Sequence, residues 1–170
     1  LSKFVVAKAL PVCTAQAAAE FVVDTALTFG VPSQLLTDNG THFRNELFQH
    51  LSTILGFEHV LSTPYHPQTN GQTERWNATM RPKLALLCQH NESNWDVFLP
   101  GVVHAYNTSI HATTGFSPSL LMFGREIPLA FDPARPVLQL PKPSDYLDHL
   151  TRQRKVALQA ASDNVRQQQC

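Results

Sequence analysis

The chain has 170 residues, of which 43% are hydrophobic, so it is long enough to bury a core and too apolar to be a disordered tail. Its 13 basic and 13 acidic residues cancel, so the net charge indicates neither a nucleic acid, nor an acidic partner, nor a membrane surface. The three cysteines are widely spaced, which favours free thiols in a reducing compartment, and no apolar run reaches the ~18–20 residues of a membrane helix. We therefore expect an intracellular globular domain whose contacts with any nucleic acid are local.

The first part of the chain alternates between strand and helix patterns. The β-branched and aromatic run over residues 4–10 predicts a strand. Thr14 is a good N-cap for a helix over residues 15–29. A short strand over residues 34–37 then delivers Asp38 at its carboxyl end, where open α/β sheets place their chemistry.

The rest of the chain is mainly helical. The patterns predict a helix over residues 45–56, an edge-like strand over 58–62 and a loop over 63–71. A long helix over residues 72–90 follows, and then shorter helices over 95–108 and 118–123. A proline-rich linker over residues 128–143 leads to a last helix, which Ser144 caps and which runs to about residue 168. The long helix has an apolar side formed by Trp76, Met80, Leu84 and Leu87. Its opposite side carries Glu74, Asn77 and Arg81, and Pro82 predicts a kink.

Two carboxylates are the most informative residues. Asp38 ends a strand and Glu74 lies near the start of the long helix, with 35 residues between them. If the fold brings them together, they offer oxygen ligands of the kind that Mg²⁺ prefers. A two-metal site normally needs a third carboxylate, because ions about 3.5–4 Å apart share bridging ligands, and we find no suitable third acid in the sequence. Each residue also has an ordinary alternative: Asp38 as a turn residue and Glu74 as a favourable charge at a helix N-terminus.

Two longer strings narrow these alternatives. Residues 35–43 read Leu-Leu-Thr-Asp-Asn-Gly-Thr-His-Phe, and residues 65–77 read Tyr-His-Pro-Gln-Thr-Asn-Gly-Gln-Thr-Glu-Arg-Trp-Asn. Together with residues 106–118 and 121–125, they resemble the integrase catalytic core of LTR retrotransposons, most closely the gypsy type, and of retroviruses. The resemblance covers roughly residues 1–130. It implies an α/β, RNase H-like core with a mixed sheet, in which the strand over residues 4–10 is the third and the first two strands are missing.

The same resemblance implies a DDE site for 3′-end processing and strand transfer of DNA. Asp38 would be the second acid and Glu74 the third, and both would bind Mg²⁺ or Mn²⁺. The first acid would belong to a strand that precedes Leu1, so we expect this chain alone to be inactive. Asp24 does not replace it, because Asp24 falls in the middle of a predicted helix. The implied partners are transposon and target DNA and further copies of the chain, without a membrane or a small-molecule cofactor, and the implied site of action is the nucleus.

The loop over residues 63–71 resembles the mobile active-site loop of this family. DNA-binding roles are expected for Tyr65, His66, Gln68, Asn70 and Gly71 in this loop and for Asn77 and Arg81 on the long helix. Such contacts would be largely independent of sequence and sensitive to salt. Packing is the ordinary alternative for Tyr65, and a solvated helix face for Arg81.

For the domain organisation, we expect a core over residues 1–127, a linker over 128–143 and a C-terminal helix over 144–170 that needs a partner surface. Two functions stay open at this stage. The first is a fragment of an integrase, and the second is a catalytically dead, host-captured remnant that binds DNA or protein. Because a sheet without its first strands leaves backbone groups unpaired, we also expect the isolated fragment to be unstable or aggregation-prone.

Overall fold

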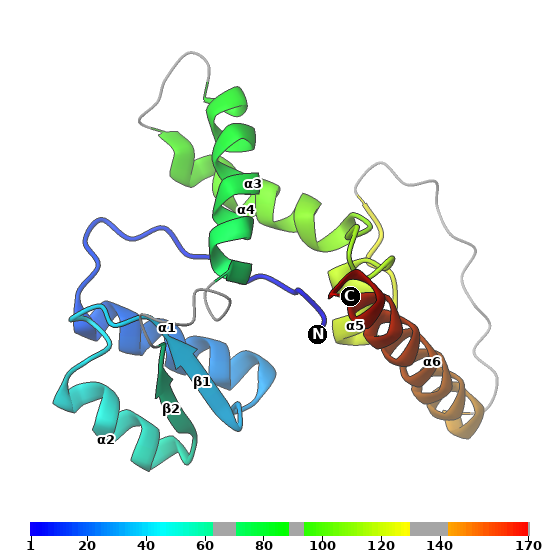
Figure 1. Cartoon of the computed structure of the whole chain (residues 1–170), viewed down its shortest axis with the longest axis horizontal. Helices are drawn as coiled ribbons and strands as arrows, with labels where there is room; N and C mark the ends of the chain where they lie inside the picture. Colours follow the sequence, from blue (N-terminus) through cyan, green and yellow to red (C-terminus); the bar gives the residue numbers. More distant parts are fainter. Residues whose placement is uncertain (63–70, 89–93, 130–142, 170) are drawn as a thin grey trace. The chain divides into compact units, whose positions relative to one another are not determined.

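The computed structural model describes residues 1–62, 71–88, 94–129 and 143–169 (Figure 1). It divides the chain into two compact units, one formed by Lys8–Leu99 and the other by Leu1–Ala7 with Pro100–Cys170. Among the helices of the described residues, none is both long and apolar enough to cross a bilayer.

The unit Lys8–Leu99 contains a small parallel sheet. Its strands are β1, Gln34–Thr37, and β2, Glu58–Leu61, paired in register from Gln34 opposite Glu58 to Thr37 opposite Leu61. The helix α2, Glu46–Leu55, connects them, as a crossover between parallel strands requires. The helices α2 and α1, Ala15–Phe29, lie beside this sheet (Figure 1), and their side chains form an apolar cluster with a residue of β1. The members of this cluster are Ala18, Ala19, Val22, Leu35, Phe43, Phe48 and Leu51.

Local capping chemistry sets the helix ends in this unit. Thr14 Oγ1 accepts a hydrogen bond from the Ala17 amide at 3.1 Å, and Asn45 Oδ1 accepts one from the Phe48 amide at 3.1 Å. The predicted bounds of α1 and β1 are confirmed. The predicted second helix is one residue too long at each end, because Asn45 and Gly56 are its caps and Gly56 adopts a left-handed φ of 76°.

The predicted strand over residues 4–10 is wrong, because this segment has no regular secondary structure. Within the described residues the sheet consists of β1 and β2 alone, so the segment has no strand beside it with which to form a ladder. A side chain takes that place at one residue. The Val5 amide donates to Asn107 Oδ1 at 2.9 Å, and Asn107 Nδ2 donates to the Val5 carbonyl at 2.8 Å.

The long helix α3 spans Gly71–Leu87 and continues through Pro82. On its predicted apolar side Met80 is buried, and Trp76 and Leu84 are half-buried. The prediction for Leu87 is wrong, since its side chain is 51% exposed and the following Cys88 is buried instead. The next helix, α4, spans Trp95–Thr108 as predicted.

The unit formed by Leu1–Ala7 and Pro100–Cys170 contains α5, Pro118–Phe123, and α6, Pro143–Gln169. The bounds of α5 are confirmed, and Ser117 caps it by accepting from the Leu120 amide at 3.1 Å. Ser144 is not the cap of the last helix, because that helix already includes Pro143, a residue well suited to a first turn. Residues 130–142 of the predicted linker lie outside the described residues.

The partner surface that α6 was expected to need is present within its own unit. Leu121 of α5 packs with Ala157 and Ala161 of α6, and Phe116 and Leu158 extend this cluster. Asn164 Nδ2 adds a hydrogen bond to the Thr114 carbonyl at 2.9 Å. The apolar stripe of α6 is thin, and its two buried alanines are the residues that pack against Leu121.

Candidate active site

Asp38 follows the last residue of β1 and is exposed to solvent. Its Oδ1 accepts a hydrogen bond from the Gly40 amide at 3.0 Å. This contact closes a turn after the strand and orients the carboxylate. The turn interpretation of Asp38 is therefore correct for its local geometry, and it is compatible with a ligand role because the other carboxylate oxygen stays available.

The residues on either side of Asp38 are anchored to the β2 strand or its end. The Thr37 carbonyl accepts from the Ser62 amide at 2.8 Å, and Thr37 Oγ1 lies 2.9 Å from His59 Nε2. On the other side, Asn39 Nδ2 donates to the Ser62 carbonyl at 2.6 Å. Burial lowers the pKa of His59, so the ring stays neutral more readily, and its Nε2 can accept a hydrogen bond from the Thr37 hydroxyl.

Gly40 shows how tightly this turn is packed. A Cβ at residue 40 would lie 2.5 Å from His42 Cε1 and 2.9 Å from Asp38 Oδ1. The His42 ring and the Asp38 carboxylate are therefore both close to the side of Gly40 that a side chain would occupy. Sequence reasoning missed His42 beside this turn and His59 beside Thr37. The only local signal was the position of His42, two residues after the glycine.

Glu74 lies in the first turn of α3 and is exposed. Asn77 and Arg81, which share its predicted side of the helix, are exposed as well. Gly71 is the first residue of α3 rather than part of the predicted loop. The other four residues with predicted DNA-binding roles, Tyr65, His66, Gln68 and Asn70, lie outside the described residues. Their roles, like those of Asn77 and Arg81, stay predictions.

The described residues meet the requirements of a divalent metal site only in part. Asp38 and Glu74 provide hard oxygen donors, which suit Mg²⁺. In the part of the chain that the structure describes, no three side chains of His, Cys, Asp or Glu come together, and no hydrogen bond or ion pair joins Asp38 to Glu74. The donor type thus fits a DDE site, whereas the number of donors does not complete one.

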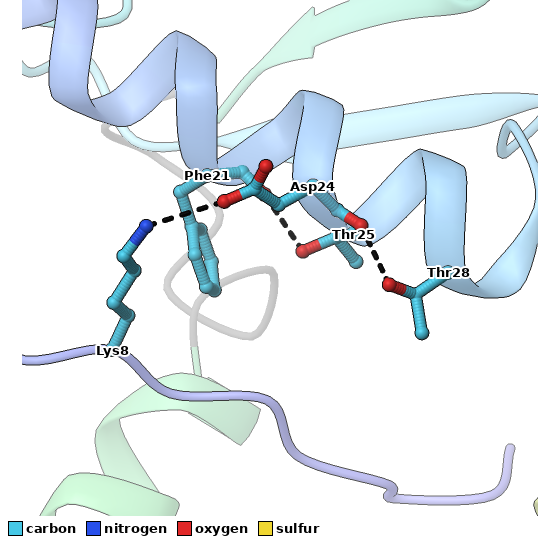
Figure 2. Close-up of polar contacts among 5 residues, drawn as sticks. All are labelled: Lys8, Phe21, Asp24, Thr25 and Thr28. Atoms are coloured by element: carbon cyan, nitrogen blue, oxygen red, sulfur yellow. Dashed lines mark hydrogen bonds and ion pairs between the residues drawn. The ribbon is translucent and has the colours of Figure 1, made fainter.

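Asp24 does not provide the third acid. It lies in the middle of α1, where its Oδ2 forms an ion pair with Lys8 Nζ at 3.2 Å (Figure 2). Its backbone carbonyl accepts from Thr28 Oγ1 at 2.8 Å, in the same way that Phe21 accepts from Thr25 one turn earlier. Asp24 is thus a surface helix residue with a local partner.

This arrangement is the fold of a retroviral integrase catalytic core, which is RNase H-like. The chain is similar to the catalytic core domain of BIV integrase, with a TM-score of 0.61 and 24% identity over 72% of this chain and 80% of that one. It is also similar to a chain of the simian T-cell lymphotropic virus intasome in complex with PP2A regulatory subunit B56 gamma, with a TM-score of 0.57 and 24% identity over 75% of this chain and 46% of that one. The predicted RNase H-like class is confirmed.

In sequence, the chain is homologous to a segment of retrotransposon polyproteins. It is 30% identical over 137 residues to the Transposon Tf2-3 and Tf2-4 polyproteins of Schizosaccharomyces pombe, a match that covers 81% of this chain. The chain spans about a tenth of the length of these relatives, 10% in each case. No protein-family model matches it. The resemblance predicted from residues 35–43 and 65–77 is confirmed by these relatives.

Proposed function

We propose that the chain is the catalytic-core segment of a retrotransposon integrase, acting in DNA integration. The observation that carries the proposal is the placement of two acids in an integrase-core fold. Asp38 stands at the carboxyl end of β1, and Glu74 stands in the first exposed turn of α3. Homology to Tf2 polyproteins supports the same coarse role.

In this proposal Asp38 and Glu74 are two of the three carboxylates that hold Mg²⁺ or Mn²⁺. Divalent ions in such a site supply the Lewis acidity needed for attack of water or a 3′-hydroxyl on a phosphodiester. The chain's own residues hold Asp38 in a fixed turn and present Glu74 on a solvent-facing helix side. A third carboxylate would have to join Asp38 and Glu74 to complete the set, because two ions about 3.5–4 Å apart share bridging ligands.

DNA is the proposed partner of the exposed α3 side. Arg81 and Asn77 would contact phosphates along the same side that carries Glu74, with the residues of the 65–71 segment adjacent in sequence. Phosphate contacts position the nucleic acid without reading its sequence. Action on chromosomal DNA places the protein in the nucleus, and pairing of two DNA ends calls for several copies of the chain.

A strand-transfer assay in Mg²⁺ on a version extended N-terminally through a strand that bears an aspartate tests this proposal. Asp38→Asn and Glu74→Gln are expected to abolish strand transfer, while the matched control Asp24→Asn retains it, because the Asp24 carboxylate pairs with Lys8 on the surface. If the extended protein is active and tolerates both changes, the assignment of the site is wrong. If it binds DNA in a salt-dependent way but never transfers strands, the alternative of a non-catalytic binding module is correct.

A further inference from the structure

The end of β1 shows an unusual continuation of the sheet ladder. The last paired residues are Thr37 and Leu61, so Asp38 would come opposite Ser62 if the ladder ran one step further. In a parallel ladder, Ser62 would donate its amide to the carbonyl of residue 37 and accept at its carbonyl from residue 39. The first of these bonds is present with ordinary geometry, from the Ser62 amide to the Thr37 carbonyl at 2.8 Å.

A side chain makes the second bond. The Ser62 carbonyl accepts from Nδ2 of Asn39 at 2.6 Å, so the primary amide of Asn39 provides the N–H that the backbone would otherwise supply. The main chain can therefore leave the strand at Asp38 while the Ser62 carbonyl still accepts a hydrogen bond. It turns at once, and the Gly40 amide reaches Asp38 Oδ1 at 3.0 Å.

Asp38 is consequently an exposed carboxylate between two anchored neighbours. Thr37 is held through its carbonyl by Ser62 and through its hydroxyl by His59, and its side chain is 8% exposed. Asn39 is held through its side chain, which donates to the Ser62 carbonyl. Of these contacts, the Asn39 bond is the one that a substitution can remove without changing β1, β2 or Asp38 itself.

We propose that Asn39 is a positioning residue that fixes the Asp38 carboxylate by closing the β1 ladder through the Ser62 carbonyl. The role of Asp38 as a metal-binding carboxylate rests on the proposed function, whereas the fixing of its place in the turn does not. Asn39 acts only through Asp38. Partners that orient a metal ligand in this way typically change metal affinity on the order of 10–100-fold when they are removed.

The test compares Asn39→Ala with Thr14→Ala in the full chain. Both substitutions remove one side-chain hydrogen bond at the end of an element, but the Thr14 bond caps α1 and joins no residue of the β1–β2 ladder. The probe is Mn²⁺, followed by paramagnetic broadening of the Asp38 and Glu74 carboxyl ¹³C signals. The expected result is Mn²⁺ binding weakened about 10–100-fold in Asn39→Ala and unchanged in Thr14→Ala. Equal Mn²⁺ affinity in Asn39→Ala and the unsubstituted chain would overturn the proposal.

Two further measurements keep the outcome decisive. If the unsubstituted chain, which provides two of the three carboxylates, does not bind Mn²⁺, the ¹⁵N order parameter of the Asp38 amide decides the positioning role. A lower order parameter in Asn39→Ala but not in Thr14→Ala supports it, and no change overturns it.

If Asn39→Ala does not fold, the Asn39 side-chain amide protons of the unsubstituted chain decide instead. Slow exchange with solvent supports the proposal, and exchange at the rate of a free amide overturns it.

Discussion

Replacing Asn107 with alanine should release the N-terminal segment from its unit. The side chain of Asn107 is 6% exposed and forms both of its hydrogen bonds with one residue, donating to the Val5 carbonyl and accepting from the Val5 amide. Alanine removes both bonds and leaves both backbone groups of Val5 without this partner. The change concerns two segments of one unit, Leu1–Ala7 and the part of α4 that follows Pro100.

The geometry sets the size of the effect. A net intramolecular hydrogen bond contributes about 0.5–1.5 kcal/mol, so two bonds of 2.8 and 2.9 Å contribute roughly 2–3 kcal/mol at the upper part of this range. We take no further penalty for unpaired groups, because Val5 is only part-buried and water can reach its backbone. In a chain of this size each kcal/mol lowers Tm by about 2–4 °C.

Hydrogen exchange of the Val5 amide measures this contact directly. Loss of about 2–3 kcal/mol corresponds to exchange that is roughly 30–140-fold faster, since each 1.4 kcal/mol is tenfold. The control is His104→Ala on the same helix, where an exposed side chain is lost and stability should change by less than about 0.5 kcal/mol. If the Val5 amide exchanges at the same rate in Asn107→Ala and His104→Ala, the pairing does not hold the segment.

Two further predictions concern a helix end and a pH dependence. Gly124→Ala should destabilise the chain by about 1–2 kcal/mol in urea unfolding, because residue 124 has a φ of 73°, whereas Gly101→Ala in α4, with no atom near its added Cβ, should stabilise it by about 0.5–1 kcal/mol. Equal effects of the two glycine substitutions would contradict this reading of the α5 cap. Because burial lowers the folded pKa of His59, the unfolded chain binds this proton first, so stability should fall as pH drops below about 6.5. Urea unfolding measured between neutral and acidic pH should show that the free energy of unfolding depends less on pH in His59→Gln. An unchanged dependence on pH would show that His59 does not contribute to it.

The helices and strands whose bounds were predicted correctly from sequence patterns are those that adjacent residues cap or end. Thr14 caps α1, Gly30 follows its last residue, and the predicted bounds of the helix and of β1 are confirmed. Capping needs only a few neighbouring residues, so the local sequence is enough to predict where such a helix begins and ends. The same holds for α5, whose start at Pro118 depends on the adjacent Ser117.

The strand predicted over residues 4–10 is wrong because its formation depends on a distant part of the chain rather than on neighbouring residues. Its β-branched and aromatic composition fits a strand, but a strand exists only when a second one pairs with it. Whether such a partner lies alongside is a property of the fold rather than of the segment. Nothing in the sequence of α4 indicated that Asn107, 102 residues away, would meet Val5 instead.

In the candidate site, too, the features that local sequence determines were predicted, and the contacts between distant residues were not. Asp38 and Glu74 could be singled out because each stands in a recognisable string, and the structure places them at a strand end and in a first helical turn. The contacts that hold Asp38 join residues 22 and 23 positions apart, Thr37 with His59 and Asn39 with Ser62. They depend on the register of β1 against β2, which no single string contains.

Asn39 and Asn107, to which the sequence analysis gave no individual role, solve the same physical problem. A primary amide carries N–H donors and a carbonyl acceptor in one plane, as a peptide group carries its own donor and acceptor, and it can therefore replace a missing strand neighbour. Asn107 offers both groups to Val5, and Asn39 offers its donor to Ser62 at the point where the main chain leaves the ladder. In each case backbone groups are satisfied without a further strand, which lets the chain turn away or end its pairing at that residue. At Asp38 this has a functional consequence, because a continued strand would tie up the backbone beside the carboxylate, whereas the side-chain substitute leaves the turn to Gly40 and the carboxylate open to solvent.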